Sequence, residues 1–378
     1  MKIVSFGLYN PIPIKSGADS YITSLLVPLG RTKEVIHYYF FQSQNEKGHY
    51  SKERNFQTIY LESNFAKKFL KQHDFIQLLR PELLVDKGPL KNIAADLVIC
   101  DTFTFHAGNY VAKKNNAPIV LIKHNIEWKY LQSQGSNGYI FLKAYEHYTL
   151  HKANVIITIS KSDYEYFTKY VDEARIYFIP PKVNTDIFRP DGPVQNLGDD
   201  KFNVLFFGSL DRPMNIDALH FIKYRLIPRL KQMNLLEKIR VNIFGSGIPP
   251  ESLKLNEDKD ISYLGSVDDP GRYIRGADLV IVPVTNAGGM KIRILEVLLC
   301  GKPAIITPEI SVGLPDEFKE FVCIEEDTEG FLKAIKRFSE GSVMNKINRA
   351  VIEDYLNKSK TMSDVVDDFF KKNIQAEK

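Results

Sequence analysis

The chain has 378 residues, of which 44% are hydrophobic and 25% are charged, so it exceeds one ordinary core and we expect two domains. Its 50 basic and 46 acidic side chains leave a net charge of +4, which is weak for a nucleic-acid-binding protein. No run of about 18 uncharged apolar residues occurs, so we expect no membrane span. The first residues resemble a buried strand and not a secretory signal.

Two features bear on where the protein works. Cys100, Cys300 and Cys323 are widely spaced, which favours free thiols in a reducing compartment over a disulfide framework or a metal site. We therefore expect a cytoplasmic protein. Residues 65–91 are locally basic, and a solvated helix face explains them most simply. The alternative is peripheral contact with anionic lipid at the inner face of the membrane.

In the first half of the chain, short apolar runs rich in β-branched and aromatic residues alternate with helical patterns. Such alternation predicts a parallel sheet covered by helices on both faces. Residues 22–29 and 141–152 show the helical spacing. The expected strands are residues 2–6, 35–41, 57–61, 96–101, 118–122, 154–159 and 175–179.

The alternation pauses at residues 180–200, which are rich in proline and lack periodicity, and then resumes. The second series predicts strands at 202–208, 239–245, 261–264, 278–282, 303–307 and 321–324, and helices at 216–232, 289–300 and 328–339. The pattern therefore predicts two Rossmann-like, doubly wound α/β domains that face each other across a cleft. We expect domains at 1–185 and 186–355, with a final helix at 356–378 that returns toward the first domain.

One segment, residues 278–306, has the features of an anion site. A strand leads to Gly288 and Gly289, and a helix opens at Met290 and Lys291. Free amides at a helix N-terminus attract phosphate, and glycines permit close backbone approach. Glu296, deeper in the helix, could accept hydrogen bonds from ribose hydroxyls. The alternative is a Gly-Gly turn before an amphipathic helix whose charged residues face water.

An ordered set of motifs surrounds this segment and resembles the retaining glycosyltransferases of the GT-B fold, the group 1 or family 4 class. In the second half the motifs are Gly208-Ser209, Gly245-Ser-Gly247, Gly265-Ser-Val267, Gly289-Met-Lys291-Ile-Arg293-Ile-Leu-Glu296 and Gly301-Lys-Pro303. In the first half they are the loop 13–17, His124-Asn125-Ile-Glu127, Ile159-Ser160 with Asp163, and the hinge 180–190.

The resemblance implies a retaining enzyme that moves a sugar from a nucleotide-diphosphate donor to a glycan, a lipid-linked acceptor or a small molecule. His124, Lys291 and Arg212 are the expected catalytic residues, and Gly17, Asn125 and Glu127 are expected to bind the acceptor. The expected donor-binding residues are Gly208, Ser209, Gly245, Gly247, Gly265, Val267, Gly288, Gly289, Met290, Arg293 and Glu296. Positive charge at the helix end can stabilise the leaving diphosphate without a metal, so we expect neither metal nor cofactor beyond the donor sugar.

The chain also departs from the family pattern. Gly288 occupies the place of the first of two acidic residues, so only Glu296 remains. Ser209 and Met214 stand where many members carry Arg and Lys, which leaves the diphosphate to Lys291, the helix end, and Arg212 or Arg293. A nucleotide-sugar epimerase and a non-catalytic scaffold therefore stay open as alternatives. A dinucleotide-binding oxidoreductase fits poorly, because the G-x-G-x-x-G pattern is incomplete.

Overall fold

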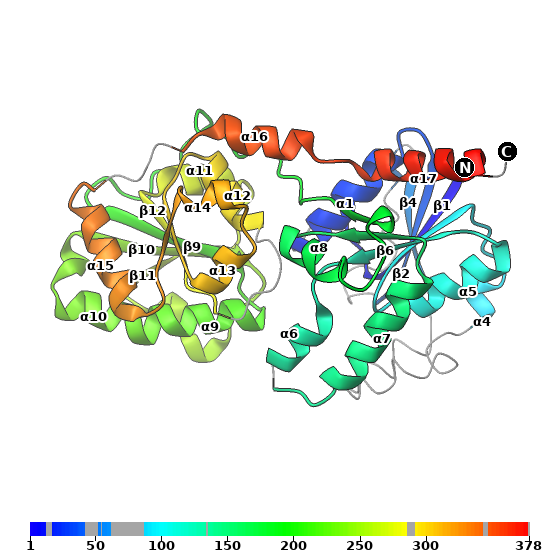
Figure 1. Ribbon diagram of the computed structural model, residues 1–378. Coiled ribbons are helices and arrows are strands. Elements are labelled where there is room, and N and C mark those ends of the chain that lie inside the picture. Colours follow the sequence, from blue (N-terminus) through cyan, green and yellow to red (C-terminus); the bar gives the residue numbers. More distant parts are fainter. Residues whose placement is uncertain are drawn as a thin grey trace. The chain divides into compact units, whose positions relative to one another are not determined.

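The computed structural model describes residues 1–12, 17–41, 52–53, 55–61, 87–133, 135–285, 292–342 and 347–376. The chain divides into two compact units (Figure 1). Unit 1 comprises Met1–Pro181 and Ser359–Lys378, and unit 2 comprises Lys182–Lys358. The chain passes from unit 1 to unit 2 between Pro181 and Lys182, a few residues before the boundary at 185/186 expected from the sequence.

Unit 1 is built on an eight-stranded sheet in the order β3-β4-β2-β1-β5-β6-β7-β8. All neighbouring strands are parallel except β3 and β4. The order reverses between β1 and β5, which makes a topological switch point there. The strands are β1 (Lys2–Tyr9), β2 (Glu34–Phe41), β3 (Lys52–Glu53), β4 (Phe56–Tyr60), β5 (Leu97–Asp101), β6 (Ile119–Lys123), β7 (Val155–Thr158) and β8 (Ile176–Phe178).

Helices cover both faces of this sheet because successive strand residues point to opposite sides. Ile3 and Ile99 join a core beneath α1 and α17, whereas Val4 and Val98 join a second core beneath α5, α7 and α8. The helices are α1 (Gly17–Leu29), α4 (Lys87–Leu90), α5 (Phe105–Asn115), α6 (Glu127–Ser133), α7 (Tyr139–Lys152), α8 (Lys161–Phe167) and α17 (Met362–Ala376).

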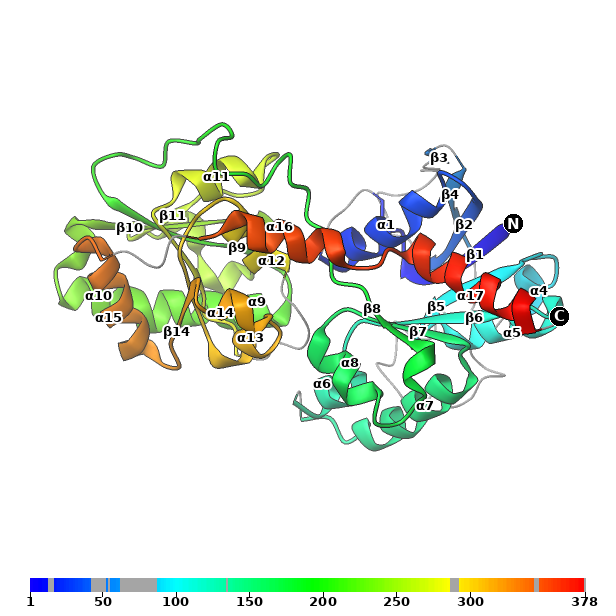
Figure 2. The same cartoon turned by 45° about the horizontal axis from the view of Figure 1, so that its top comes forward.

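The end of the chain forms two helices, and the last one begins at Met362 within the final helix expected at 356–378. α16 (Arg349–Lys358) belongs to unit 2, and α17 packs beside α1 in unit 1 (Figure 2). The break has a local cause at Thr361. Its Oγ1 accepts the N–H of Asp364 at 3.2 Å, and Asp364 Oδ2 accepts the N–H of Thr361 at 2.8 Å. This reciprocal cap starts a new helix.

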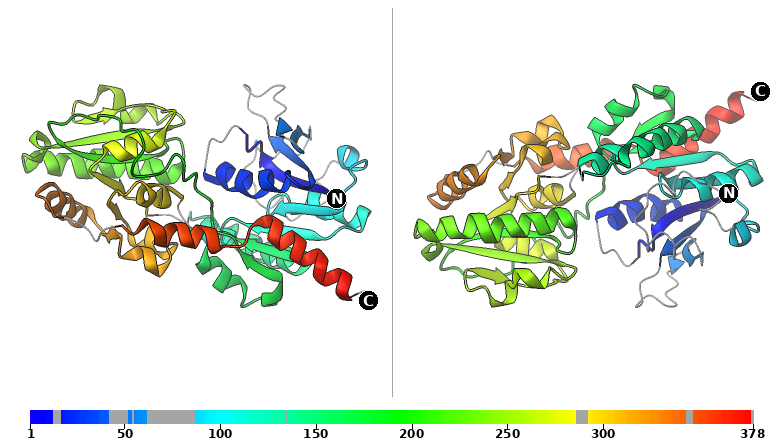
Figure 3. Two further views of the ribbon diagram at one scale, coloured as in Figure 1. Left: turned by 90° about the horizontal axis from the view of Figure 1, so that it is seen from above. Right: turned by 90° about the horizontal axis from the view of Figure 1, so that it is seen from below.

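Unit 2 has a fully parallel six-stranded sheet in the order β11-β10-β9-β12-β13-β14, with its switch point between β9 and β12. Figure 3 shows this unit from above and from below. The strands are β9 (Phe202–Ser209), β10 (Ile239–Ser246), β11 (Ile261–Tyr263), β12 (Leu279–Val282), β13 (Ala304–Ile306) and β14 (Val322–Ile324). The remaining helices are α9 (Pro213–Phe221), which continues through a π-helical turn (Ile222–Leu226) into α10 (Ile227–Gln232), α11 (Pro270–Gly276), α12 (Ile292–Leu299), α13 (Pro308–Val312), α14 (Asp316–Lys319) and α15 (Thr328–Ser339).

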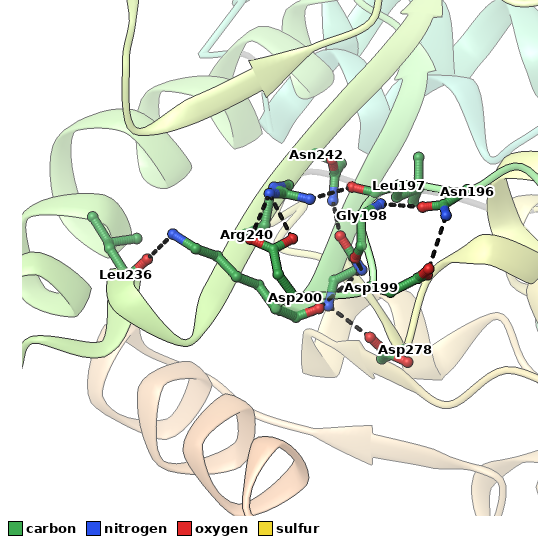
Figure 4. Close-up of polar contacts among 11 residues, drawn as sticks. Asn196, Leu197, Gly198, Asp199, Asp200, Leu236, Arg240, Asn242 and Asp278 are labelled. Atoms are coloured by element: carbon green, nitrogen blue, oxygen red, sulfur yellow. Dashed lines mark hydrogen bonds and ion pairs between the residues drawn. The ribbon is translucent and has the colours of Figure 1, made fainter.

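The aperiodic segment that opens unit 2 is held by side-chain hydrogen bonds. Arg240 donates to the Leu197 carbonyl at 2.5 Å and to Asp200 Oδ1 at 2.9 Å (Figure 4). The Asn203 N–H donates to Asp278 Oδ2 at 2.7 Å, which ties β9 to the start of β12. Buried Arg275 donates to the carbonyls of Ile187, Arg189 and Pro193 at 2.7 to 3.0 Å. These hydrogen bonds hold the irregular segment at the start of unit 2 against the rest of that unit.

Three expectations from composition can be compared with the structure. Cys100, Cys300 and Cys323 are free cysteines, as expected. No described helix combines the length and the apolarity needed to cross a membrane. Most of the basic stretch 65–91 lies outside the described residues, which resume at α4.

Candidate functional site

In unit 2 the switch point lies at the carboxyl ends of β9 and β12, where α/β sheets bind their ligands. Strand β9 ends at Gly208 and Ser209, and a turn leads to Arg212, which directly precedes α9. Gly208 pairs with Gly245 across the β9–β10 ladder, and the Gly245 N–H donates to the Gly265 carbonyl at 2.9 Å. The glycine turns that are far apart in sequence therefore meet at one edge of the sheet.

Close packing explains why glycines stand at this edge. A Cβ on Gly208 would lie 3.0 Å from Asn215 Nδ2 and would also strike Arg293, and a Cβ on Gly245 would overlap the Gly208 carbonyl. Gly247, with φ +77°, and Gly265, with φ +69°, adopt backbone conformations that side chains disfavour. Substitution at Gly208 or Gly245 would displace the strand ends that form the edge, and substitution at Gly247 or Gly265 would strain the backbone.

Arg293, on α12, is the charged residue built into this edge. Its Nη2 donates to Asn215 Oδ1 at 2.9 Å, and Asn215 Nδ2 donates to the Ser209 carbonyl at 2.8 Å. The guanidinium carbon lies 5.4 Å from the ring centroid of Phe206 and 5.7 Å from that of Phe207. Within the described residues, the buried Nη1 has no hydrogen-bond partner. An unpaired buried guanidinium N–H is costly and is suited to an anionic ligand.

Glu296 lies one helical turn beyond Arg293. Burial raises the pKa of the Glu296 carboxyl to about 7, and the charge of Arg293 opposes this rise. Burial likewise lowers the pKa of Arg293 to about 10, against the effect of Glu296. Near neutral pH the Glu296 carboxyl can therefore donate or accept a hydrogen bond, which suits contact with hydroxyl groups.

Some of the other residues expected at the donor site are described by the structure, and the rest lie outside the described residues. Ser209 Oγ lies 3.2 Å from Ser246 Oγ at the joined strand ends, and Val267 is partly buried two residues after Gly265. Arg212 is exposed in the turn between β9 and α9. Gly288, Gly289, Met290 and Lys291 lie outside the described residues. The structure therefore brings the strand-end glycines and Arg293 together, and the place of Lys291 stays a prediction.

One Asp-x-Asp triplet, Asp258-Lys259-Asp260, bears on the expectation that no metal is needed, because paired carboxylates can hold a divalent ion. Asp258 Oδ2 binds Lys223 Nζ at 2.7 Å, and Asp260 Oδ2 binds Lys231 Nζ at 2.7 Å. Each carboxylate thus has a lysine as its counter-charge. Among the described residues, no group of three or more His, Cys, Asp or Glu could hold a metal ion.

In unit 1 the His124 segment is bounded by a buried ion pair that the sequence did not indicate. Lys123, the last residue of β6, is 0% exposed and pairs with Glu146 of α7, which is 1% exposed. Lys123 also donates to Thr102 Oγ1. The same Glu146 oxygen accepts the N–H of Glu127, the first residue of α6, at 3.0 Å. Glu146 Oε1 therefore contacts residues on both sides of the loop that contains His124 and Asn125, Lys123 before it and Glu127 after it.

Further carboxyls gather around this ion pair. Burial raises the pKa of Glu127 to about 8, against the charge of Lys123 and with support from Glu146, Asp101 and Asp163. Burial also raises the pKa of Asp163 to about 6, although a hydrogen bond from Ser160 opposes the rise. With one lysine among four acidic residues, Glu127 is held in its neutral form near pH 7 and can donate a hydrogen bond.

His124 follows Lys123 at the carboxyl end of β6. Its ring packs edge-on against Tyr21 of α1, with 6.0 Å between the centroids, and the Tyr21 hydroxyl donates to the Ile179 carbonyl at 2.9 Å. Burial, with a smaller contribution from Lys123, lowers the pKa of His124 despite the opposing Asp101. The imidazole is therefore neutral near pH 7 and can both donate and accept. Gly17 begins α1 and Asn125 is partly buried in the loop.

Two doubly wound parallel units, each with polar residues at the carboxyl ends of its strands, define a GT-B-type α/β protein. A family model described as Glycosyltransferase Family 4 matches residues 46–187, and one described as Glycosyl transferases group 1 matches residues 201–340. Together they span most of the chain. The chain is therefore a member of the group 1 and family 4 glycosyltransferases. No curated protein sequence matches it.

Solved structures share the fold over the whole length. Sucrose-phosphate synthase from Thermosynechococcus elongatus has a TM-score of 0.75 and 16% identity, with 100% of each chain covered. Trehalose-6-phosphate synthase (OtsA) has a TM-score of 0.69 and 13% identity, covering 98% of this chain and 99% of that one. Anabaena HepE, in complex with UDP and glucose, has a TM-score of 0.66 and 14% identity, with 99% of each chain covered. At these identities the likeness concerns the fold.

Proposed function

We propose that this glycosyltransferase moves a hexosyl group from a nucleotide-diphosphate sugar to a hydroxyl of a glycan, a lipid-linked molecule or a small acceptor. The anomeric configuration is retained and no metal ion takes part. Family membership supports the reaction class. The guanidinium N–H of Arg293 that has no partner among the described residues, at the glycine-lined edge and one turn from Glu296, carries the assignment of the donor site.

The donor's negative charge is the reason for this assignment. A diphosphate at the edge would satisfy Arg293 Nη1, because the Arg293 guanidinium packs directly against Gly208 at the end of β9. Lys291, outside the described residues, adds a second positive charge in this proposal, and Glu296 accepts hydrogen bonds from ribose hydroxyls. HepE, a protein of the same fold, is seen with UDP, so uridine diphosphate is the first nucleotide to test.

The proposed transfer proceeds on one face of the sugar. The acceptor oxygen attacks the anomeric carbon from the side that the diphosphate leaves, and the bond from that carbon to the diphosphate oxygen breaks. The hydroxyl proton passes to the departing oxygen, which keeps the electron pair. Positive groups fixed near that oxygen lower the barrier, typically by a few kcal/mol each. The neutral His124 positions the sugar or the incoming hydroxyl.

A binding experiment tests the donor site. Melting temperatures are measured with uridine, guanosine and adenosine diphosphates and with their sugars, since a ligand that binds only the folded state raises the melting temperature. Arg293→Met, which keeps an apolar chain against Phe206 and Phe207, should abolish the shift for the preferred nucleotide. Arg225→Met, at an exposed arginine of unit 2, is the matched control. A full shift in Arg293→Met removes this residue from the donor site.

Product analysis separates the alternatives. A transferase releases nucleotide diphosphate and forms a glycoside when a suitable hydroxyl is present. An epimerase changes the sugar or releases it to water without needing an acceptor. If no common activated sugar loses its nucleotide diphosphate, with or without acceptors, the scaffold alternative replaces the proposal.

A further inference from the structure

Positive charge is concentrated in one layer of unit 1. Residues 105–170 contain eight lysines and four acidic residues, and their net charge of +4 equals that of the entire chain. Glu127, Glu146 and Asp163 are buried, so the one acidic side chain exposed in the described part of this range is Glu165. The seven exposed lysines are Lys113, Lys114, Lys129, Lys143, Lys152, Lys161 and Lys169.

The fold places these lysines on one side of the sheet. Phe105 of α5, Tyr145 of α7 and Phe167 of α8 enter the same core, so these three helices cover the same face (Figure 2). The opposite face is covered by α1 and α17, and α17 carries three aspartates and two lysines. The layer that contains α5, α7 and α8 therefore has a clear excess of exposed lysines, whereas α17 on the opposite face carries charges of both signs.

Within the cationic layer, α7 is apolar on its outer side as well as on its inner side. Leu142, Tyr145 and Leu150 are buried in the core, whereas Ile140 is 60% exposed, Phe141 49% and Tyr148 41%. A single exposed apolar residue is ordinary, but a group on one helix face marks an interaction surface. We define the α7 outer face as Ile140, Phe141, Lys143, Tyr148 and Lys152.

Aromatic rings and lysines lie together along this helix. Lys143 Nζ is 4.6 Å from the ring centroid of Trp128, and Lys152 Nζ is 6.0 Å from that of Tyr148. Lysines, tryptophan and tyrosine combine an apolar body with a polar tip, which suits the boundary between water and acyl chains. An in-plane helix at such a boundary has this combination of apolar residues and flanking lysines.

We propose that the α7 outer face docks unit 1 on an anionic lipid surface. Ile140 and Phe141 enter the boundary of the headgroup layer, and Lys143 and Lys152 extend to lipid phosphates. The lysines flank the exposed apolar residues along a single helix, which is the arrangement of an in-plane helix at a lipid boundary, whereas binding that needs the lysines alone would point to an acidic protein. The α7 outer face includes none of residues 65–91, and the inference does not depend on the proposed sugar transfer.

Sedimentation with vesicles tests the proposal. The full chain is mixed at low ionic strength with vesicles of phosphatidylcholine alone or of phosphatidylcholine with phosphatidylglycerol. We expect sedimentation with the anionic vesicles that weakens as salt is added. Ile140→Ser with Phe141→Ser, and separately Lys143→Glu with Lys152→Glu, should each weaken binding by about tenfold or more. All four side chains are exposed, so the fold should be preserved.

The control is Met233→Ser with Lys238→Glu, which makes the same kinds of change at exposed residues of unit 2. It should bind as the wild type does. The proposal is overturned if the wild type stays in the supernatant, or if the control loses as much binding as the α7 variants. It is also overturned if the lysine changes abolish binding while the Ile140 and Phe141 changes leave it intact, because the layer would then attract any polyanion, acidic proteins included.

Discussion

Replacing Glu146 by leucine should destabilise unit 1 by about 3–5 kcal/mol, because the buried charge of Lys123 loses the carboxylate with which it forms an ion pair. Lys123 is 0% exposed, so its ammonium group cannot recover water by a change of rotamer alone. The Glu127 N–H loses its acceptor as well, which adds about 1–3 kcal/mol if no other group replaces it. Leucine fills a similar volume, so the loss reports charge and hydrogen bonding more than a cavity.

A second variant isolates the electrostatic part. Lys123→Met combined with Glu146→Leu removes both charges, and replacing a buried ion pair by apolar residues is often neutral or stabilising. The double variant should therefore be more stable than Glu146→Leu by at least about 2 kcal/mol. The remaining loss belongs to the Glu127 N–H and to Thr102, which Lys123 no longer contacts.

The chain offers its own reporter for this experiment. The single tryptophan, Trp128, lies on α6 directly after Glu127, so its fluorescence in urea follows the unfolding of unit 1. Asp367→Asn is the control, because Asp367 pairs with Lys33 at 2.9 Å but is 47% exposed. That change should cost less than about 1 kcal/mol. A loss of under about 1 kcal/mol in Glu146→Leu, or a double variant no more stable than the single one, would refute the reasoning.

Three further predictions concern protonation, the anion site and metal dependence. Burial raises the pKa of Glu127 to about 8 from 4.5, so the folded state holds this proton more tightly than the unfolded state, and the unfolding free energy falls as pH rises from about 4.5 to about 8. In Glu127→Gln that fall should be smaller, as measured by Trp128 fluorescence in urea at several pH values; an unchanged slope contradicts the assignment. Lys291→Ala should lower turnover of the donor sugar by about 100-fold or more with an unchanged melting temperature, and a wild-type rate would place Lys291 outside the site. Adding a chelator should leave turnover unchanged, whereas activity that is lost with chelator and restored by a divalent ion would overturn the metal-free proposal.

The strand pattern predicted the fold well because buried parallel strands have a strong local signal. Residues 2–6 and 202–208 are apolar runs that became β1 and β9, next to the two switch points. The helix expected from residue 216 begins three residues earlier, at Pro213, since proline fits the first turn of a helix. The return of the last helix to unit 1 was also expected, although its start at Met362 depends on the local cap formed by Thr361.

The candidate site was predicted only in part, because sequence patterns do not encode contacts between distant elements. Lys123 ends an apolar strand and would ordinarily be taken for a solvated residue, and its partner Glu146 lies on helix α7, 23 residues away. Asn215 is a similar case. Its link to Arg293 spans 78 residues and forms only when α9 and α12 pack at the same edge of the sheet. A buried lysine has no local signature that distinguishes it from an exposed one.

The packing of α17 on unit 1 has a consequence for how the protein is made. The polypeptide leaves unit 1 at Pro181 and rejoins it at Ser359, so unit 2 is an insertion between two pieces of the other unit. Met362, Val365 and Val366 are 2%, 0% and 1% exposed, so a protein ending at Pro181 would leave the apolar surface beneath them open to water. During synthesis, the residues of unit 2 emerge from the ribosome before α17 does. The later unit can therefore finish folding first, while the earlier one waits for its last helix.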